Sequence, residues 1–112
     1  MKTTIVNLNE EAYDVYAGRG KKGKVPQNPG DYGWLGNPYS KEKFGEQAVP
    51  MFKDYFYNRL RRDEKFLLEV LKCRGKKLGC FCGHEGCHAQ IVADFLNRIE
   101  EVAEEYTESS ET

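Results

Sequence analysis

The sequence predicts a small α/β domain in which a partly parallel sheet is covered by helices. Two short strand-forming segments stand near the N-terminus, and a third follows two helical segments. A strand reached through a helical crossover runs parallel to its neighbour, so the sheet should be at least partly parallel. With the last helical segment, these elements have the rough order β-β-loop-α-α-β-α. The 112 residues provide one hydrophobic core and no second one.

The two N-terminal strands are predicted by alternation and by residue type. Within residues 3–8, Thr4, Val6 and Leu8 alternate with Ile5 and Asn7. Residues 14–17 place Val15 beside Tyr16. Because β-branched and aromatic side chains favour an extended backbone, we expect two short strands before the first long loop.

A long loop should follow, because residues 18–38 contain six glycines and three prolines and no hydrophobic period. Long irregular segments in compact domains are usually functional or mobile. Residues 18–25 match a phosphate-binding loop up to its last position. There Val25 replaces the Ser or Thr that would hold magnesium, and the prolines that follow prevent the required helix. We therefore expect a basic loop that clamps a phosphate or carboxylate, without a triphosphatase site.

Three helices are predicted by apolar spacing and by end signals. The first begins near Gln47, because Pro50 is tolerated only in a first turn and the following apolar residues have helical spacing. Asp63 can cap the second helix, which Gly75 ends. The third begins near Cys87 and has the longest apolar stripe, formed by Ile91, Val92, Phe95, Leu96, Ile99 and Val102.

A cysteine–histidine cluster stands where the last strand meets the last helix. The strand is predicted over residues 77–82, so Cys80 and Cys82 share one face at its carboxyl end, while Cys87 and His88 open the helix. In open α/β sheets this junction is where ligands bind. The four cysteines of the chain lie within fifteen residues, which favours metal or thiol chemistry over structural disulfides.

Zinc binding is one interpretation of the cluster, because thiolates and imidazole are ligands that zinc prefers. The candidate metal ligands are Cys80, Cys82, Cys87 and His88. Their spacing matches no common zinc-finger pattern, and the adjacent Cys87 and His88 reach one metal only through a tight backbone. His84 or Cys73 could replace one of them.

Nucleophilic chemistry is the second interpretation, with Cys80, Cys87 and His88 as catalytic candidates. A helix N-terminus stabilises a thiolate, and a nearby imidazole can act as its base. The third interpretation is structural. In that case Cys80 and Cys82 are buried as small apolar residues, and His88 only caps the helix.

Charge is unevenly distributed along the chain. Residues 100–112 carry six Glu and no Lys or Arg, and the rest of the chain has 17 Lys and Arg against 12 Asp and Glu. A basic body favours a small anionic partner such as a nucleotide, and nucleic acid is not excluded. Solvated surface lysines explain the same surplus equally well. We expect residues 1–105 to form the domain and residues 106–112 to form an acidic, mobile tail.

The distribution of apolar residues along the chain predicts the cellular compartment. No segment approaches the roughly 18 to 20 apolar residues that cross a membrane, so no membrane partner is expected. The first residues lead directly into a strand-like run and lack the apolar stretch of a secretory signal. Together with the clustered cysteines, these features predict a cytoplasmic protein.

Five short motifs, taken in order, resemble the phage and bacterial family called domain of unknown function 4326. The motifs are Val15-Tyr16-Ala17-Gly18-Arg19, Trp34-Leu35-Gly36-Asn37-Pro38, Arg74-Gly75-Lys76, Cys80-Phe81-Cys82 and Cys87-His88. The resemblance spans residues 13–98. Leu35 is an insertion after Trp34, the loop after Arg19 is long, and Ala89 replaces the usual glycine. The C-terminal third is also faintly similar to domain of unknown function 488.

The resemblance implies a fold and a site, and it names no reaction. Arg19, Asn37 and Arg74 are expected to bind ligand in one crevice with the cysteine–histidine cluster, the two arginines through forked hydrogen bonds to an anion. The expected function is binding or processing of a nucleotide-like or other anionic ligand. The alternative is a zinc-stabilised interaction module, phage-encoded and directed at a host protein.

Overall fold

The sheet places its last strand in the centre. The computed structural model describes residues 2–81 and 87–111, with side chains described through residue 103. Its strands have the order β1-β3-β2 and are β1 (Thr4–Asn7), β2 (Val15–Tyr16) and β3 (Lys77–Cys80). Leu78 of β3 pairs with Ile5 on one side and with Val15 on the other, and both pairings are parallel. The predicted α/β class is confirmed, and the described strands form a wholly parallel sheet.

Tyr13 explains why a glycine stands within β3. The chain leaves β1 and crosses the sheet to begin β2 on the other side of β3, and Tyr13 of this connection lies against Gly79. A Cβ on Gly79 would lie 2.5 Å from Cγ of Tyr13, so a side chain has no room there. Leu78 and Cys80 alternate with Gly79 and face the other way, where both are buried in the core.

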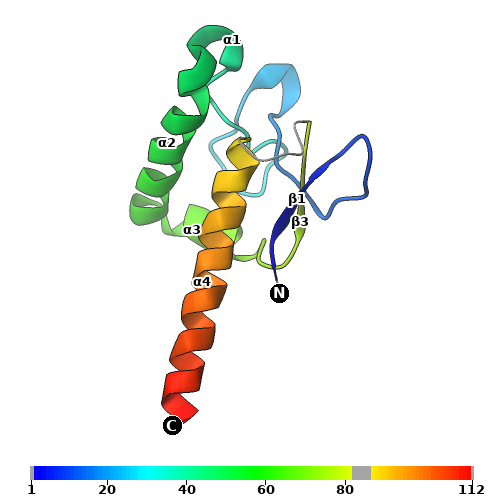
Figure 1. The fold of residues 1–112 in the computed structure, drawn as a ribbon. Coiled ribbons are helices and arrows are strands. Elements are labelled where there is room, and N and C mark those ends of the chain that lie inside the picture. Colours follow the sequence, from blue (N-terminus) through cyan, green and yellow to red (C-terminus); the bar gives the residue numbers. More distant parts are fainter. Residues whose placement is uncertain (1, 82–86, 112) are drawn as a thin grey trace.

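The helices lie together on one side of the sheet (Figure 1). The described residues form the α-helices α1 (Lys41–Phe44), α2 (Ala48–Arg62), α3 (Glu64–Leu71) and α4 (His88–Glu111). Asp63 caps α3 as predicted, because its Oδ1 accepts a hydrogen bond from the backbone N–H of Phe66 at 3.1 Å. The sequence analysis missed the single-turn α1, which begins after Ser40. The Ser40 hydroxyl accepts from the backbone N–H of Lys43 at 3.2 Å.

Aromatic rings form the centre of the core. Phe52, Phe56 and Phe66 are at most 1% exposed. The Phe56 ring lies 5.8 Å from that of Phe66 and 5.7 Å from that of Phe95, with edge-to-face geometry in both pairs. Trp34, from the long loop, meets Phe66 edge-on at 5.7 Å. Because burying one such ring stabilises the fold by about 1.5–3 kcal/mol, Trp34 anchors the long loop to the helices.

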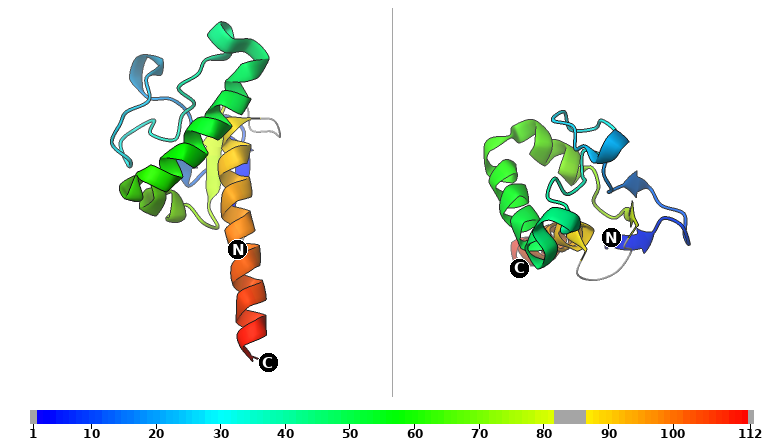
Figure 2. Two further views of the ribbon diagram at one scale, coloured as in Figure 1. Left: turned by 90° about the vertical axis from the view of Figure 1, so that its left-hand side faces the viewer. Right: turned by 90° about the horizontal axis from the view of Figure 1, so that it is seen from above.

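The last helix extends beyond the rest of the molecule. Figures 1 and 2 show the C-terminal part of α4 projecting away from the sheet and from α2 and α3. The helix is described as far as Glu111, and the boundary expected after residue 105 stays a prediction. Although α4 has 24 residues, none of the described helices is long and apolar enough to cross a membrane.

Candidate functional site

A cavity of about 530 Å³ opens where β2 and β3 end. We call it the strand-end cavity. Its walls come from the end of β2 and the loop that follows, from the end of β3, and from the first turn of α4. The predicted site residues that line it are Arg19, Asn37, Cys80, Cys87 and His88. Because parallel strands end at the same edge of a sheet, residues from distant parts of the chain meet here.

Two thiols are in contact in this cavity. Cys80 is the last residue of β3 and Cys87 directly precedes α4, and their Sγ atoms are 3.2 Å apart. Both residues are buried, whereas Phe81, which follows Cys80, is 63% exposed. Cys82 lies outside the described residues, so its predicted place beside Cys80 stays a prediction.

His88 is held in one tautomer by the end of β2. Its Nε2 lies 2.6 Å from the carbonyl oxygen of Ala17, and a carbonyl can only accept, so Nε2 carries the proton. Nδ1 then has a lone pair, and it lies 3.6 Å from Sγ of Cys87. Burial lowers the pKa of His88 below its ordinary value, against the opposing effect of the Ala17 hydrogen bond. The neutral imidazole can therefore take a proton from the Cys87 thiol or donate its lone pair to a metal.

Asn37 positions Arg19. The Arg19 Nε donates a hydrogen bond to the backbone carbonyl of Asn37 at 2.7 Å, which orients the guanidinium group. The buried Asn37 side chain donates to the carbonyl of Ala48 at 3.0 Å and accepts from the backbone N–H of Tyr39 at 2.9 Å. Asn37 thus connects the long loop to the start of α2, and its predicted direct contact with a ligand stays a prediction.

Glycines let two segments of the long loop approach each other closely. A Cβ on Gly33 would lie 2.1 Å from the backbone nitrogen of Gly20, and φ of Gly33 is +91°. A Cβ on Gly36 would lie 2.8 Å from Cα of Arg19. No side chain fits at such backbone separations, so the wall that carries Arg19 depends on these glycines.

Tyrosines add an aromatic surface that the sequence analysis missed. The rings of Tyr16 and Tyr32 are stacked, with centroids 4.9 Å apart and planes at 10°. Tyr16 also meets Phe81 edge-on at 6.5 Å, and its hydroxyl donates to the backbone carbonyl of Arg19 at 2.7 Å. Burial, followed by the neighbouring Tyr32, raises the pKa of Tyr16 to about 12, so this hydroxyl stays protonated. The sequence feature that could have predicted this surface is Tyr32, an aromatic residue within a loop rich in glycine and proline.

Arg74 is not among the described residues that line the strand-end cavity, so its predicted contact with a ligand there stays a prediction. It is exposed on the turn that precedes β3, whereas Cys80 ends that strand. The two ends of a strand face opposite edges of the sheet, so the backbone of Arg74 lies toward the edge opposite Cys80. Cys73 lies on the same turn, where its buried thiol is 3.6 Å from the carbonyl of Glu69. Burial raises the pKa of Cys73 to about 11, which leaves this thiol unreactive.

The predicted zinc set is only partly within the described residues. Cys80, Cys87 and His88 are close together, while Cys82 and His84 lie outside the described residues. Among the described residues, no group of three or more His, Cys, Asp or Glu is arranged to hold a metal ion. Zinc binding therefore stays a prediction that depends on Cys82 or His84.

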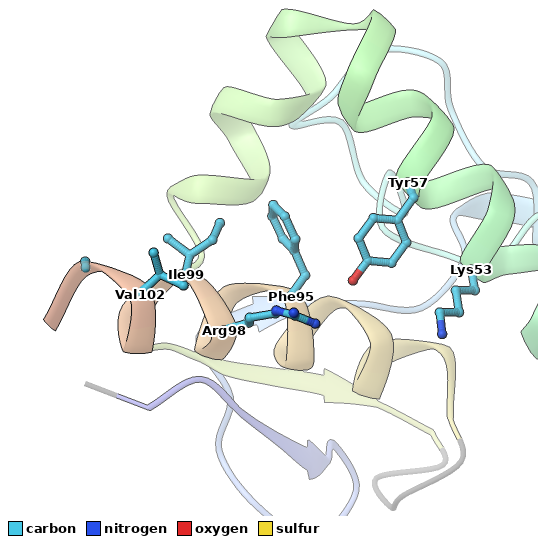
Figure 3. Close-up of a pocket in the computed structure, with 7 residues that line it drawn as sticks. Lys53, Tyr57, Phe95, Arg98, Ile99 and Val102 are labelled. Atoms are coloured by element: carbon cyan, nitrogen blue, oxygen red, sulfur yellow. The ribbon is translucent and has the colours of Figure 1, made fainter. Parts of the chain in front are cut away.

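A larger cavity, of about 870 Å³, lies between α2 and α4. We call it the helix groove. Figure 3 shows Tyr57 and Lys53 of α2 on one side of Phe95 and Arg98, with Ile99 and Val102 farther along α4 on the other side. None of the predicted site residues lines it. This cavity, which is larger than the strand-end cavity, is thus separate from the cysteine–histidine cluster.

Fold and site together define a small parallel α/β domain with a thiol–imidazole cluster at the strand ends. The chain belongs to the family described as domain of unknown function DUF4326, whose model matches residues 3–98. It is 29% identical over 96 residues to a protein of Enterobacteria phage T4 named "uncharacterized 12.4 kDa protein in nrdA-td intergenic region". That alignment covers 85% of this chain and 78% of the T4 protein. No solved structure matches the chain.

Proposed function

We propose that the chain binds a small anionic ligand of the nucleotide class in the strand-end cavity. The observation that carries the proposal is the charge of the lining. Arg19 and Lys41 are the cations among the described lining residues, and none of those residues is Asp or Glu. A concave site with one sign of charge concentrates ligands of the opposite sign.

Arg19 is prepared for an anion. Because its Nε is held by the carbonyl of Asn37, the guanidinium plane is oriented before a ligand arrives. A fixed guanidinium can give two parallel hydrogen bonds to a phosphate, which fits this group better than a flexible ammonium does. The cavity volume of about 530 Å³ lies within the range of small-molecule sites. The stacked rings of Tyr16 and Tyr32 give the cavity an aromatic side, which suits a nucleotide better than a bare phosphate.

The thiols supply a means of processing the ligand. Nδ1 of His88 lies 3.6 Å from Sγ of Cys87 and has no proton in the assigned tautomer. A neutral imidazole at this position can accept the thiol proton, which makes Cys87 the nucleophile and His88 its base. Such chemistry requires reduced thiols, and we propose a cytoplasmic location on that ground.

Calorimetric titration with thymidine monophosphate, adenosine monophosphate and inorganic phosphate tests the proposal. We expect at least one nucleotide to bind, and Arg19→Gln to weaken it at least about tenfold through the lost charged hydrogen bonds. Arg61→Gln is the matched control, because Arg61 is exposed on α2, donates a hydrogen bond to Asn58 and does not line the strand-end cavity. Absence of binding, or equal weakening by both variants, would refute the proposal.

A zinc-stabilised module directed at a host protein is the second candidate. Its support is the closeness of the donors. Sγ of Cys87 lies 3.6 Å from Nδ1 of His88, a zinc-like separation, and 3.2 Å from Sγ of Cys80, a pair that would have to move apart by about 0.5 Å to bind the metal. Neighbouring ligands of a tetrahedral zinc are about 3.5–3.8 Å apart for Zn–S bonds of about 2.3 Å. Ala17 would then be the outer partner that orients the histidine ligand. A phage origin of the T4 relative agrees with a host-directed role.

Elemental analysis combined with a pulse of alkylating agent distinguishes the two candidates. Zinc predicts one metal per chain and slow alkylation that becomes fast after chelation. The nucleophile predicts fast alkylation of Cys87 near neutral pH without chelator. Cys73 is the internal reference and should react slowly in both cases, because its pKa is about 11. Slow labelling of every cysteine, unchanged by chelator, would contradict both the nucleophile and the zinc site, leave a structural role for the cluster, and leave ligand binding to Arg19 and its neighbours.

A further inference from the structure

A second cavity, of about 430 Å³, adjoins the strand-end cavity. Gly20 and Tyr32 line both cavities. The rest of the second cavity is formed by one stretch of the long loop, Lys21 together with residues 24–27. The backbones of these two residues lie close together, since a Cβ on Gly20 would be 2.6 Å from the carbonyl oxygen of Tyr32. Gly20 and Tyr32 thus form the rim between the two cavities, and a ligand that extends from one cavity to the other passes over them.

The boundary between the two cavities is an aromatic platform. Tyr32 is 64% exposed, and one face of its ring is supported by Tyr16, with centroids 4.9 Å apart. A supported and exposed ring is the kind of surface on which nucleobases stack, whatever their sequence. Because this ring lines both cavities, it suits a ligand that is longer than one nucleotide and extends from one cavity to the other.

Positive charge extends over both cavities. Residues 19–24 contain four cations and residues 15–30 contain no Asp or Glu. Arg19 lines the strand-end cavity, whereas the exposed Lys21 and Lys24 line the second one. Cations distributed in this way fit a ligand whose negative charges repeat along its length.

The wall of the second cavity is fixed before a ligand binds. The backbone N–H of Gly20 donates to the carbonyl of Lys24 at 2.7 Å, which closes the basic turn. Farther along, the guanidinium of Arg59 donates to the carbonyl of Gln27. Arg59 is itself buried on α2 and donates to the hydroxyl of Tyr55 at 2.8 Å. A preformed wall lowers the entropic cost of binding.

We infer that the two cavities are consecutive subsites for a single-stranded oligonucleotide, an inference that rests on the proposed nucleotide site. One nucleotide occupies the strand-end cavity with its phosphate against Arg19. The next crosses Gly20, stacks its base on Tyr32, and turns its phosphate toward Lys21 and Lys24. DNA and RNA strands share the stacking and the repeated phosphates, so both are suitable probes.

Titrations with thymidine monophosphate, the dinucleotide pTpT and its uridine counterpart pUpU test the inference. We expect at least one dinucleotide to bind about tenfold or more tightly than the mononucleotide. The double variant Lys21→Gln/Lys24→Gln should remove that gain and leave mononucleotide binding within about twofold. Tyr32→Ala should reduce the gain and Tyr32→Phe should keep it, since stacking needs the ring and not the hydroxyl.

The control is Lys72→Gln/Lys76→Gln, which removes the same charge from an exposed turn before β3. An equal loss of dinucleotide affinity in this control would overturn the inference, because the effect would then be one of net charge. Dinucleotides that bind no more tightly than the mononucleotide would overturn the second subsite and leave the proposed function in place. Failure of mononucleotides and dinucleotides alike would overturn both.

Discussion

The strand-end cavity and the helix groove differ in how their linings arise. The helix groove, about 870 Å³ in volume, is formed by two helices, and its floor of Phe95, Ile99 and Val102 repeats with helical spacing. The strand-end cavity is smaller, at about 530 Å³, and is formed by strand ends, a glycine-rich loop and a helix start. The smaller cavity brings together cations, thiols, an imidazole and tyrosines. The polar side chains of the groove are Lys53, Tyr57 and Arg98, and its other described lining residues are apolar.

The comparison shows that the volume of a cavity does not indicate which chemical groups line it. When two amphipathic helices pack their apolar stripes together, a groove remains wherever the side chains do not fill the space between the helices. A strand-end cavity collects groups of unlike chemistry, because loops leave parallel strands at one edge and can present any side chain there. We therefore expect that, at neutral pH, substitutions in the groove change stability and substitutions in the strand-end cavity change ligand binding, with one exception.

The exception is the glycine wall, where we expect the largest effect. Gly33→Ala should lower the free energy of unfolding by about 3 kcal/mol or more, because its Cβ would overlap the backbone nitrogen of Gly20 at a positive φ. Denaturant unfolding measures this loss. Gly30→Ala is the matched control, since Gly30 has φ +101° but its Cβ would meet nothing nearer than Glu69 Oε2 at 3.8 Å. Equal losses in the two variants would show that backbone strain, and not the close approach, is responsible.

In the helix groove, Phe95→Ala should lower the free energy of unfolding by about 2–4 kcal/mol. The ring of Phe95 is partly buried and meets Phe56 at 5.7 Å and Tyr57 at 5.9 Å. Nucleotide affinity of the folded variant should be unchanged, because the groove is separate from the proposed site. Val102→Ala, at a residue that is 57% exposed, should cost less than about 1 kcal/mol. A Phe95 variant that stays folded but loses nucleotide binding would show that the helix groove and the strand-end cavity are functionally coupled.

In the strand-end cavity, His88 predicts a loss of stability in mild acid. Burial lowers its pKa in the folded protein, so below an unfolded-state pKa of about 6.5 the unfolded chain takes up a proton that the folded chain does not. Stability should be complete above that pH and should fall as the pH drops through the folded-state pKa, by at most about 1.4 kcal/mol per unit. Urea unfolding at pH 7.5 and 5.5 should show a smaller difference for His88→Gln than for the natural sequence. The same pH dependence in both proteins would assign it to other groups.

The smallest effect is expected for Arg74→Gln. The side chain is exposed on the turn before β3, away from the strand-end cavity, so nucleotide affinity should change less than about twofold and stability by less than about 0.5 kcal/mol. Calorimetric titration beside Arg19→Gln provides the comparison. If Arg74→Gln weakened binding as much as Arg19→Gln, the result would support the sequence-based prediction that Arg19 and Arg74 bind the ligand together in one crevice.

Much of the fold could be predicted because its signals are local. The Asp63 cap, the helical spacing from Val49 to Leu60 and the apolar stripe of α4 each depend on residues within a few turns of one another. The same holds for Cys80 at a strand end and Cys87 before a helix start, which marked the junction correctly. For such features the chain's own periodicity and capping residues are sufficient.

Only the tertiary structure decided which strand ends meet and what they bring together. Placing β3 between β1 and β2 carries Ala17 to His88 and thereby sets the tautomer of the imidazole. The stacking of Tyr16 on Tyr32 likewise joins the end of β2 to a distant part of the long loop. Strand pairing joins β3 to segments 63 and 73 residues away (Val15↔Leu78 and Thr4↔Lys77) through backbone hydrogen bonds that every residue type except proline can donate, so no local pattern specifies the partner. The burial of Leu78 and Cys80 against the helices selects the arrangement, and that selection belongs to the folded chain as a whole.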